Sequence, residues 1–156
     1  MSKTTYTASQ FGAHFANNNI AATDEVLAGM GQLLAEAAKR NTSNPEIAQG
    51  FLFEIIEATR FNQAHAEIGS PLRAVITSAI GKPHDVADIL IVDGQKIVEK
   101  IQAKSSSTGL NCVKEIWKKY DKYQSEDGLS FVVPKDKFDR TIELAQKRGE
   151  AGSVFS

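Results

Sequence analysis

The spacing of apolar residues near the start of the chain predicts an amphipathic helix. Asp24, a residue type that commonly caps helix N-termini, is followed by apolar side chains every three or four positions as far as Arg40. Met30 lies on the apolar side of this helix, so we expect it in the core. Residues 1–23 are only weakly patterned, and we expect them to form a short helix with a loop or a loosely held arm.

Three more helices are expected further along the chain. Asn44 is a good cap and Pro45 suits the first helical position, which predicts a helix over 44–66. Polar and apolar residues also follow a helical period over 110–124 and over 135–149. These helices are separated by shorter segments whose patterns are typical of strands.

The central segments predict a β-hairpin and two further strands. Residues 89–92 are a compact apolar run rich in β-branched side chains, and apolar and polar residues alternate over 97–103. Asp93-Gly94, which stands between them, is a strong signal for a tight turn. Shorter apolar runs predict strands over 74–80 and 129–133.

The order of these elements indicates an α/β protein. A hairpin followed by a helical crossover to another strand requires a mixed sheet, with helices packed on its faces. The chain has 156 residues, of which 42% are hydrophobic, and this is enough for one domain with its own core. We expect residues 44–156 to form the α/β core and residues 1–43 to form an N-terminal helical extension.

Three polar residues are expected to meet at one edge of the hairpin. Asp88 stands at the start of its first strand, and the antiparallel return brings the residues near position 102 back beside it. Because side chains alternate along a strand, Gln102 and Lys104 lie on the same face. An acid, an amide and a lysine grouped in this way are the layout of a metal-dependent phosphodiesterase.

A fourth polar residue stands in an apolar part of the predicted 44–66 helix. Glu54 has phenylalanine, leucine and isoleucine neighbours, and a carboxylate there is costly unless it is paired, protonated or bound to a cation. Glu57, one turn later, is expected on the surface, paired with Arg60 or Arg73. The alternative for Glu54 is ordinary exposure on the solvent side of an amphipathic helix.

Composition and charge limit the class of protein. A single cysteine, Cys112, excludes an intrachain disulfide, and no segment approaches the ~20 apolar residues of a membrane span. Met1 is followed by polar residues and not by a signal peptide, so we expect a soluble cytoplasmic protein. Residues 1–95 hold 6 Lys and Arg against 10 Asp and Glu, whereas residues 96–156 hold 12 against 9.

The basic second half contains a candidate surface for nucleic acid. The lysines that recur every four residues are Lys114, Lys118 and Lys122. A helix face of this kind, with aromatic residues between the lysines, can follow a phosphate backbone. Ser105, next to Lys104, is expected to contact phosphate as well. The alternative is an ordinary solvated face, with Trp117 of the same helix in the core.

In this order, the residues resemble the PD-(D/E)XK nuclease superfamily. The resemblance rests on Gly-x-x-Phe-Glu in a helix (Gly50, Phe53, Glu54), an aspartate at the start of a strand (Asp88), and Gln-x-Lys at the end of the next strand (Gln102, Lys104). Glutamine in place of the usual acid is similar to the Mrr-like restriction endonuclease group. The resemblance covers roughly residues 44–133 and implies a restriction-endonuclease-like αβββαβ core.

The resemblance also implies an activity, the hydrolysis of DNA phosphodiester bonds with Mg²⁺ or Mn²⁺. Glu54, Asp88, the side-chain oxygen of Gln102 and the carbonyl of Ala103 would hold the cation. Lys104 would orient the attacking water and stabilise the developing charge. Because Gln102 is neutral, we expect weak metal binding without substrate and a strong dependence on Glu54.

Several alternatives stay open at this point. Asp85 also matches the Pro-Asp element of the superfamily, but Asp88 is favoured because it directly enters the apolar run. The expected partner is DNA, with a homodimer and an inhibitor or immunity protein as further candidates. The role is that of a restriction or defence effector, or of a nuclease toxin. The competing functions are a non-catalytic nucleic-acid-binding or assembly protein, and an unrelated α/β domain in which Asp88 and Lys104 form an ion pair.

Overall fold

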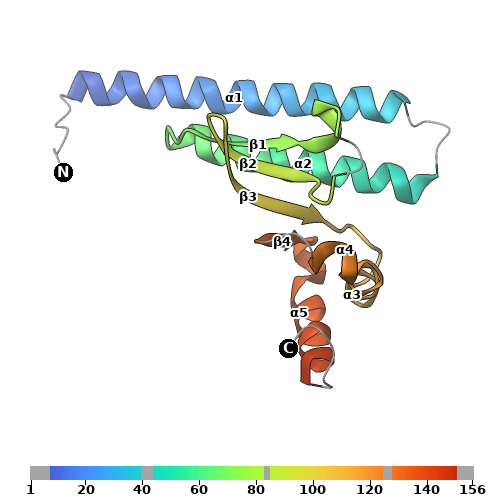
Figure 1. Ribbon diagram of the computed structural model, residues 1–156. Helices are drawn as coiled ribbons and strands as arrows, with labels where there is room; N and C mark the ends of the chain where they lie inside the picture. Colours follow the sequence, from blue (N-terminus) through green and yellow to red (C-terminus); the bar gives the residue numbers. More distant parts are fainter. Residues whose placement is uncertain (1–7, 40–43, 83–84, 125–127, 151–156) are drawn as a thin grey trace.

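The computed structural model describes residues 8–39, 44–82, 85–124 and 128–150, which form a mixed α/β fold (Figure 1). The elements in chain order are α1 (Ala8–Lys39), α2 (Pro45–Glu67), β1 (Leu72–Ile76), the 3₁₀ helix η1 (Thr77–Ile80), β2 (Ile89–Asp93), β3 (Lys96–Ala103), α3 (Gly109–Lys118), α4 (Tyr120–Gln124), β4 (Leu129–Val132) and α5 (Lys135–Glu150). Figure 1 shows the two long helices beside the sheet and the C-terminal helices grouped near β4. In the described ranges, no helix is both long enough and apolar enough to cross a membrane.

The four strands form one mixed sheet in the order β1-β2-β3-β4. β2 is antiparallel to both of its neighbours, whereas β4 runs parallel to β3, which it follows after α3 and α4. Asp93 pairs with Lys96 and leaves a two-residue turn, in which Gly94 has a φ of 60°. Type II′ hairpin turns favour glycine at this first position because it needs a positive φ. The expected hairpin and mixed sheet are therefore confirmed.

The main hydrophobic core lies between α2 and the first two strands. Its buried residues are Ile55, Ala58, Ala74, Ile76, Ile89 and Ile91. α1 packs along α2, and Leu33 of α1 reaches this core. Gly29 allows the close approach of the two helices, because a Cβ at this position would overlap the side chain of Thr59. The two helices thus cover one face of the sheet as a double layer.

The first helix differs from the prediction. It continues without a break through Asp24, which is therefore an internal residue and not an N-cap. Met30 is 53% exposed, so the prediction that it lies in the core is wrong. The reason is that α1 contacts α2 through a different stripe, in which Ala22 is buried. The expected loop before residue 24 is also wrong from Ala8 onward, and residues 1–7 lie outside the described residues.

Most other elements follow the predicted ranges to within a few residues, with two exceptions. The strand expected over 74–80 ends at Ile76 and continues as η1. The helix expected over 110–124 is interrupted at Lys119, whose N–H donates to the carbonyl of Ile116 (3.3 Å). α3 and α4 are therefore separate helices, and lysines before and after the interruption do not form one continuous stripe.

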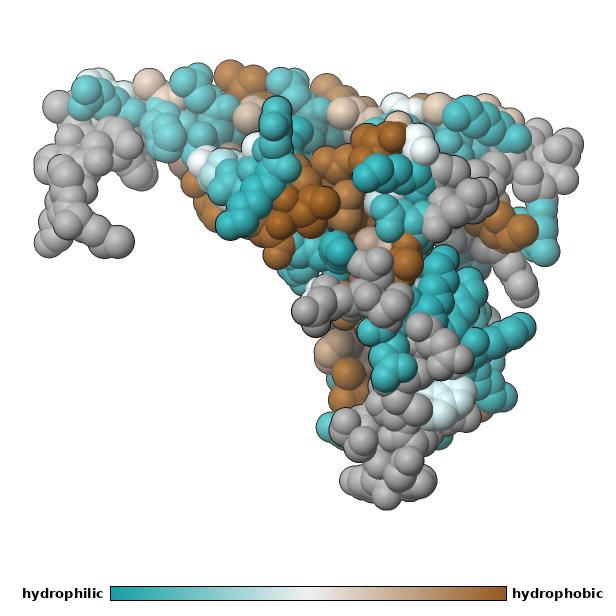
Figure 2. Space-filling model, in the orientation of Figure 1, coloured by the Kyte–Doolittle hydropathy of each residue, from teal (hydrophilic) through white to brown (hydrophobic). Residues whose placement is uncertain are grey.

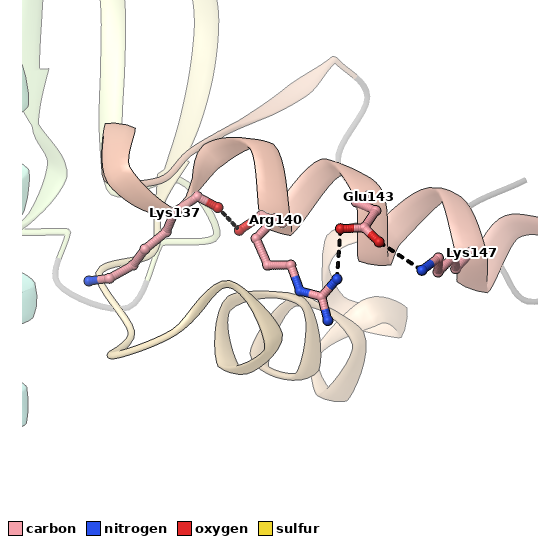
Figure 3. Close-up of polar contacts among 5 residues, drawn as sticks. Lys137, Arg140, Glu143 and Lys147 are labelled. Carbon is pink, nitrogen blue, oxygen red and sulfur yellow. Dashed lines mark hydrogen bonds and ion pairs between the residues drawn. The ribbon is translucent and has the colours of Figure 1, made fainter.

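The last helix, α5, packs against α3 and carries a network of exposed ion pairs (Figure 3). Glu143 accepts hydrogen bonds from Lys147 (2.7 Å) and Arg140 (2.6 Å). These two bonds hold the pKa of Glu143 at about 2, so its carboxylate stays ionised at neutral and mildly acidic pH. The side chains are all exposed, and pairs of this kind contribute little to stability.

Candidate functional site

Polar residues from the hairpin, its flanking loops and α2 line an open pocket of about 530 Å³. Glu54 comes from α2, and Asp88 precedes the first residue of β2. Gln102 lies near the end of β3, and Lys104 follows that strand directly. The structure thus brings together the four side chains that were predicted to act together.

The backbone of Asp88 is held by hydrogen bonds on both sides. Its N–H donates to the carbonyl oxygen of Ile101 in β3 (2.9 Å), and its carbonyl oxygen accepts from the N–H of Thr77 (2.9 Å). The hydroxyl of Thr77, which is a buried residue, donates to the carbonyl oxygen of Ala87 (2.9 Å) and also contacts that of Asp88 (3.2 Å). The junction between β1 and η1 therefore positions the start of β2 and its carboxylate.

The carboxylate of Asp88 accepts two hydrogen bonds from residues at the end of β3. Its Oδ2 accepts from the N–H of Ala103 (2.9 Å) and from Nε2 of Gln102. Burial raises the pKa of Asp88 above its usual value. The hydrogen bond from Ala103 and the charges of Lys104 and Lys119 oppose this effect. A nearby cation would favour the ionised carboxylate further, because opposite charges attract strongly in a partly desolvated site.

The amide of Gln102 connects two of the oxygens that are predicted as metal ligands. Gln102 is only 5% exposed, and its Nε2 donates both to Oδ2 of Asp88 and to the carbonyl oxygen of Ala103 (3.3 Å). The two oxygens therefore converge on a single positively polarised group. A half-turn of the amide would present its own oxygen beside them, since an amide carries a donor on one side and an acceptor on the other.

This donor set fits a hard divalent cation. Within the described ranges, no three His, Cys, Asp or Glu side chains form a metal-binding group. The pocket instead offers two carboxylates, from Glu54 and Asp88, with the amide of Gln102 and the carbonyl of Ala103. Mg²⁺ and Mn²⁺ accept such oxygen ligands, whereas zinc sites usually contain cysteine or histidine.

Lys104 is buried beside the carboxylate, with 8% of its surface exposed. Its N–H donates to the carbonyl oxygen of Val132 in β4 (2.9 Å), which fixes the backbone where β3 ends. Its Nζ lies 5.6 Å from the centre of the Tyr123 ring, and Tyr123 in turn makes an edge contact with Phe131 at 5.4 Å between ring centres. Among the ion pairs of the described residues, none joins Lys104 to Asp88.

The acidic residues of α2 have different environments. Glu54 is half-buried and lines both this pocket and a second cavity of about 510 Å³ next to α1 and η1. Glu54 therefore lacks the full exposure expected on the solvent side of an amphipathic helix. Glu57 forms an ion pair with Arg60 (3.0 Å), which confirms the surface pairing expected for it. Arg73, the other candidate partner, pairs with Glu25 of α1.

Asp85, the alternative to Asp88, lies at the exposed rim of the same pocket. Its Oδ1 accepts a hydrogen bond from the N–H of Val86 (2.7 Å), a local contact within the loop. Asp88 has the more buried carboxylate and the contacts to Gln102 and Ala103. Asp88, and not Asp85, is therefore the aspartate joined to the end of β3.

The residues that were predicted to bind nucleic acid separate into two groups. Ser105 and Lys122 line the pocket, whereas Lys114 and Lys118 are exposed on α3 and do not line it. In this part of the chain the pocket is lined by residues 111, 115, 119 and 123, which recur every four positions, and Lys114 and Lys118 fall outside this row.

Several polar residues that line the pocket were not among the predicted site residues. They are Gln49, Ser106, Ser107, Asn111, Glu115, Lys119 and Tyr123. Ser106 donates to Glu115 (2.5 Å) and Asn111 donates to Ser107 (3.0 Å), so these contacts tie the loop after Lys104 to α3. The three-serine run and the four-residue spacing of positions 111, 115 and 119 were the available signals.

Comparison with known proteins identifies no match to this chain. No family model, no curated protein and no solved structure matches the chain. The arrangement of the pocket therefore has to be judged on its own chemistry.

Proposed function

We propose that this chain is a Mg²⁺-dependent DNA endonuclease with a PD-(D/E)XK-type site. The observation that carries the proposal is the convergence of Asp88 Oδ2 and the Ala103 carbonyl on the amide of Gln102, with Lys104 and Glu54 in the same pocket. Two carboxylates and an amide can supply oxygen ligands to a cation, and a lysine can stabilise the negative charge that develops at the phosphate. The succession of α2, β1 to β3, α3 and β4 supports a restriction-endonuclease-like core.

The oxygen donors would hold the divalent cation. Glu54, Asp88, Gln102 and Ala103 supply two negative charges and two neutral oxygens. When bound, the cation supplies charge neutralisation at the phosphate and makes water easier to deprotonate. Because the set contains only two charges, the phosphate of the substrate would complete it, which is why we expect weak binding of the cation by the protein alone.

Lys104 would act on the attacking water and on the phosphate. Its compact ammonium group can donate to both and can stabilise the negative charge that grows during hydrolysis. The end of β3 fixes its backbone, and the ring of Tyr123 limits where the side chain can go. A lysine placed in this way needs little reorganisation when substrate binds.

The charges around the pocket support a nucleic-acid substrate. Lys119 and Lys122 line the side of the pocket formed by α4, and Ser105 lines the loop after β3. Together with Lys104 they place three cations and a hydroxyl around two carboxylates. An extended polyanion can use such cations along its backbone while one phosphate reaches the carboxylates.

The direct test is cleavage of supercoiled plasmid. We expect nicked or linear DNA to appear with Mg²⁺ or Mn²⁺ and not with EDTA, because the phosphate cannot be neutralised without the cation. An end-labelled single-stranded RNA in a parallel reaction tests the preference for DNA. DNA that is shifted in a gel but remains uncut under all conditions would contradict the endonuclease and favour a non-catalytic binding protein.

Tyr123 provides a second test, aimed at the position of Lys104. Replacing Tyr123 by leucine is expected to slow cleavage at saturating DNA by about tenfold, because it removes the ring that contacts the ammonium group. Tyr123→Phe keeps the ring and should retain the rate to within about twofold. DNA affinity, measured by gel shift, should be the same for all three proteins. Equal rates for the leucine and phenylalanine variants would contradict a positioning role for the ring.

The proposed activity is compatible with two biological roles. A small nuclease of this kind suits either a restriction or defence effector or a nuclease toxin. A toxin requires an inhibitor or immunity protein, so toxicity on expression that Lys104→Ala abolishes, in a host without such a protein, would favour the toxin.

A further inference from the structure

The outer side of α1 carries apolar residues at a seven-residue spacing. In heptad notation, the residues at positions a and d are Ala13, Ala16, Ile20, Thr23, Leu27, Met30, Leu34 and Ala37. Seven of these eight are apolar, and together they span more than three heptads. A repeat of this length is the sequence signature of a helix that packs against another helix. We call these eight residues the α1 seam.

All eight residues of the α1 seam are exposed. The large side chains are more than half exposed: Ile20 is 62%, Leu27 60%, Met30 53% and Leu34 71%. Figure 2 shows hydrophobic residues recurring along the outer edge of α1. A row of large exposed apolar side chains along one helix is a candidate interface, because leaving such side chains in water is unfavourable.

The α1 seam is distinct from the stripe that holds α1 in its own fold. That stripe contains Ala22 and Gly29, which are buried, and Leu33, which reaches the core. With 3.6 residues per turn, the second stripe is centred roughly 120° around the helix from the α1 seam, so the two occupy different sides. Within the described residues, α1 makes its main contacts with α2, and Glu25 also pairs with Arg73 of β1.

We propose that α1 pairs with α1 of a second copy of this chain through the α1 seam. A second copy offers the same repeat with the same length and spacing, which is what knobs-into-holes packing requires. Charge does not oppose this pairing. The e and g positions beside the seam are Asn17, Asn19, Asp24, Val26, Gly31, Leu33 and Ala38, of which only Asp24 is charged. The small side chains at Gly31 and Ala38 also allow close approach.

The expected contact area indicates a reversible dimer. Positions a, d and e comprise twelve exposed residues from Ala13 to Ala38. At the roughly 30–40 Å² per residue of ordinary interfaces, each copy would bury about 400 Å². The pair would bury about 800 Å² in total, which is below the roughly 1,200 Å² of stable complexes. We therefore expect a weak, transient dimer that dissociates in the micromolar range.

This inference does not depend on the proposed nuclease activity. If both hold, the dimer carries two pockets and could act on both strands of a duplex, whereas one pocket cuts one strand.

The test is the molar mass in solution over a range of concentrations. From about 1 to about 200 µM, the wild-type chain should pass from monomer to dimer in sedimentation velocity, a range that brackets a micromolar Kd. The double variant Leu27→Glu/Leu34→Glu should stay monomeric, because two carboxylates would be buried in the seam. Ala21→Glu, an exposed position of α1 outside the seam, is the matched control and should dimerise like the wild type.

A milder variant guards against loss of folding. Leu27→Ala keeps a good helix former and is expected to weaken the dimer by about tenfold while the unfolding temperature of the monomer stays the same. A wild-type chain that remains monomeric at about 200 µM would overturn the proposal. So would a dimer that the double variant and Leu27→Ala leave unchanged.

Discussion

Replacing Lys104 by alanine is expected to reduce metal-dependent plasmid cleavage by at least about 100-fold. The ammonium group is the only basic side chain among the four convergent residues, and it is held in place by the end of β3 and by Tyr123. Its removal takes away the group that would orient water and stabilise the developing charge. The initial rate of nicking, measured with Mg²⁺ and again with Mn²⁺, provides the readout.

Two controls separate this effect from other causes. Lys114→Ala removes one positive charge from an exposed position that does not line the pocket, and it should change the rate by less than about threefold. Lys104→Met keeps the length and the buried contacts of the stem without the charge, so it should be folded and as inactive as the alanine variant. A Lys104→Met protein with wild-type activity would remove Lys104 from the proposed reaction.

Replacing Asp88 by asparagine is expected to change activity and stability in opposite directions. Cleavage should fall by at least about 100-fold, because the central oxygen ligand loses its charge. The folded protein without metal should become more stable at neutral pH, which a higher Tm than that of the wild type would show. Burial is the reason, because it disfavours the ionised carboxylate but affects the neutral amide much less.

The pH dependence of this gain follows from the direction of the pKa shift. The pKa of Asp88 is raised above its usual value of 3.8, so the folded state holds the proton to a higher pH than the unfolded state. The contribution of Asp88 to the free energy of unfolding therefore decreases as pH rises from about 3.8 through the raised pKa, and it is constant above that pKa. Asp88→Asn should therefore equal the wild type in acid and exceed it at pH 7. An asparagine variant that is less stable than wild type at pH 7 would contradict the burial argument.

Thermal unfolding with added cation connects the two effects. Mn²⁺ at about five times its Kd should stabilise the wild type by about 1 kcal/mol and leave Asp88→Asn unaffected. Because Gln102 contributes no charge, we expect this to require millimolar cation in the absence of DNA. Stabilisation of the two proteins to the same extent would place the cation elsewhere.

Local patterns in the sequence were sufficient to predict the hairpin and to predict which of its polar residues share a face. Asp93-Gly94 specified the turn, since the two-residue loop needs a positive φ at Gly94. The period of two then put Gln102 and Lys104 on one face, and both line the pocket. These features depend on residues that are close in sequence, so they can be read without knowledge of the rest of the fold.

The environment of each helix was harder to predict, and the reason is contact between distant segments. Met30 is apolar and has helical spacing, but it faces outward because Gly29 brings the opposite stripe of α1 against Thr59 of α2. Similarly, the lysines of 110–124 have helical spacing, but Lys119 and Lys122 line the pocket whereas Lys118 lies outside it. The spacing of apolar residues shows which of them share a side of a helix. Which side is buried depends on where the neighbouring element packs.

The sequence by itself therefore determined the order of the elements, the α/β class and the hairpin. It also determined that Gln102 and Lys104 lie on the same face of the strand. Only the tertiary structure decided that Glu54, from a helix that precedes the sheet, shares a pocket with Asp88, and that the α1 seam is left uncovered. Turns and periods arise from backbone geometry over a few residues. Shared pockets and uncovered faces arise from the packing of segments tens of residues apart, which no local pattern encodes.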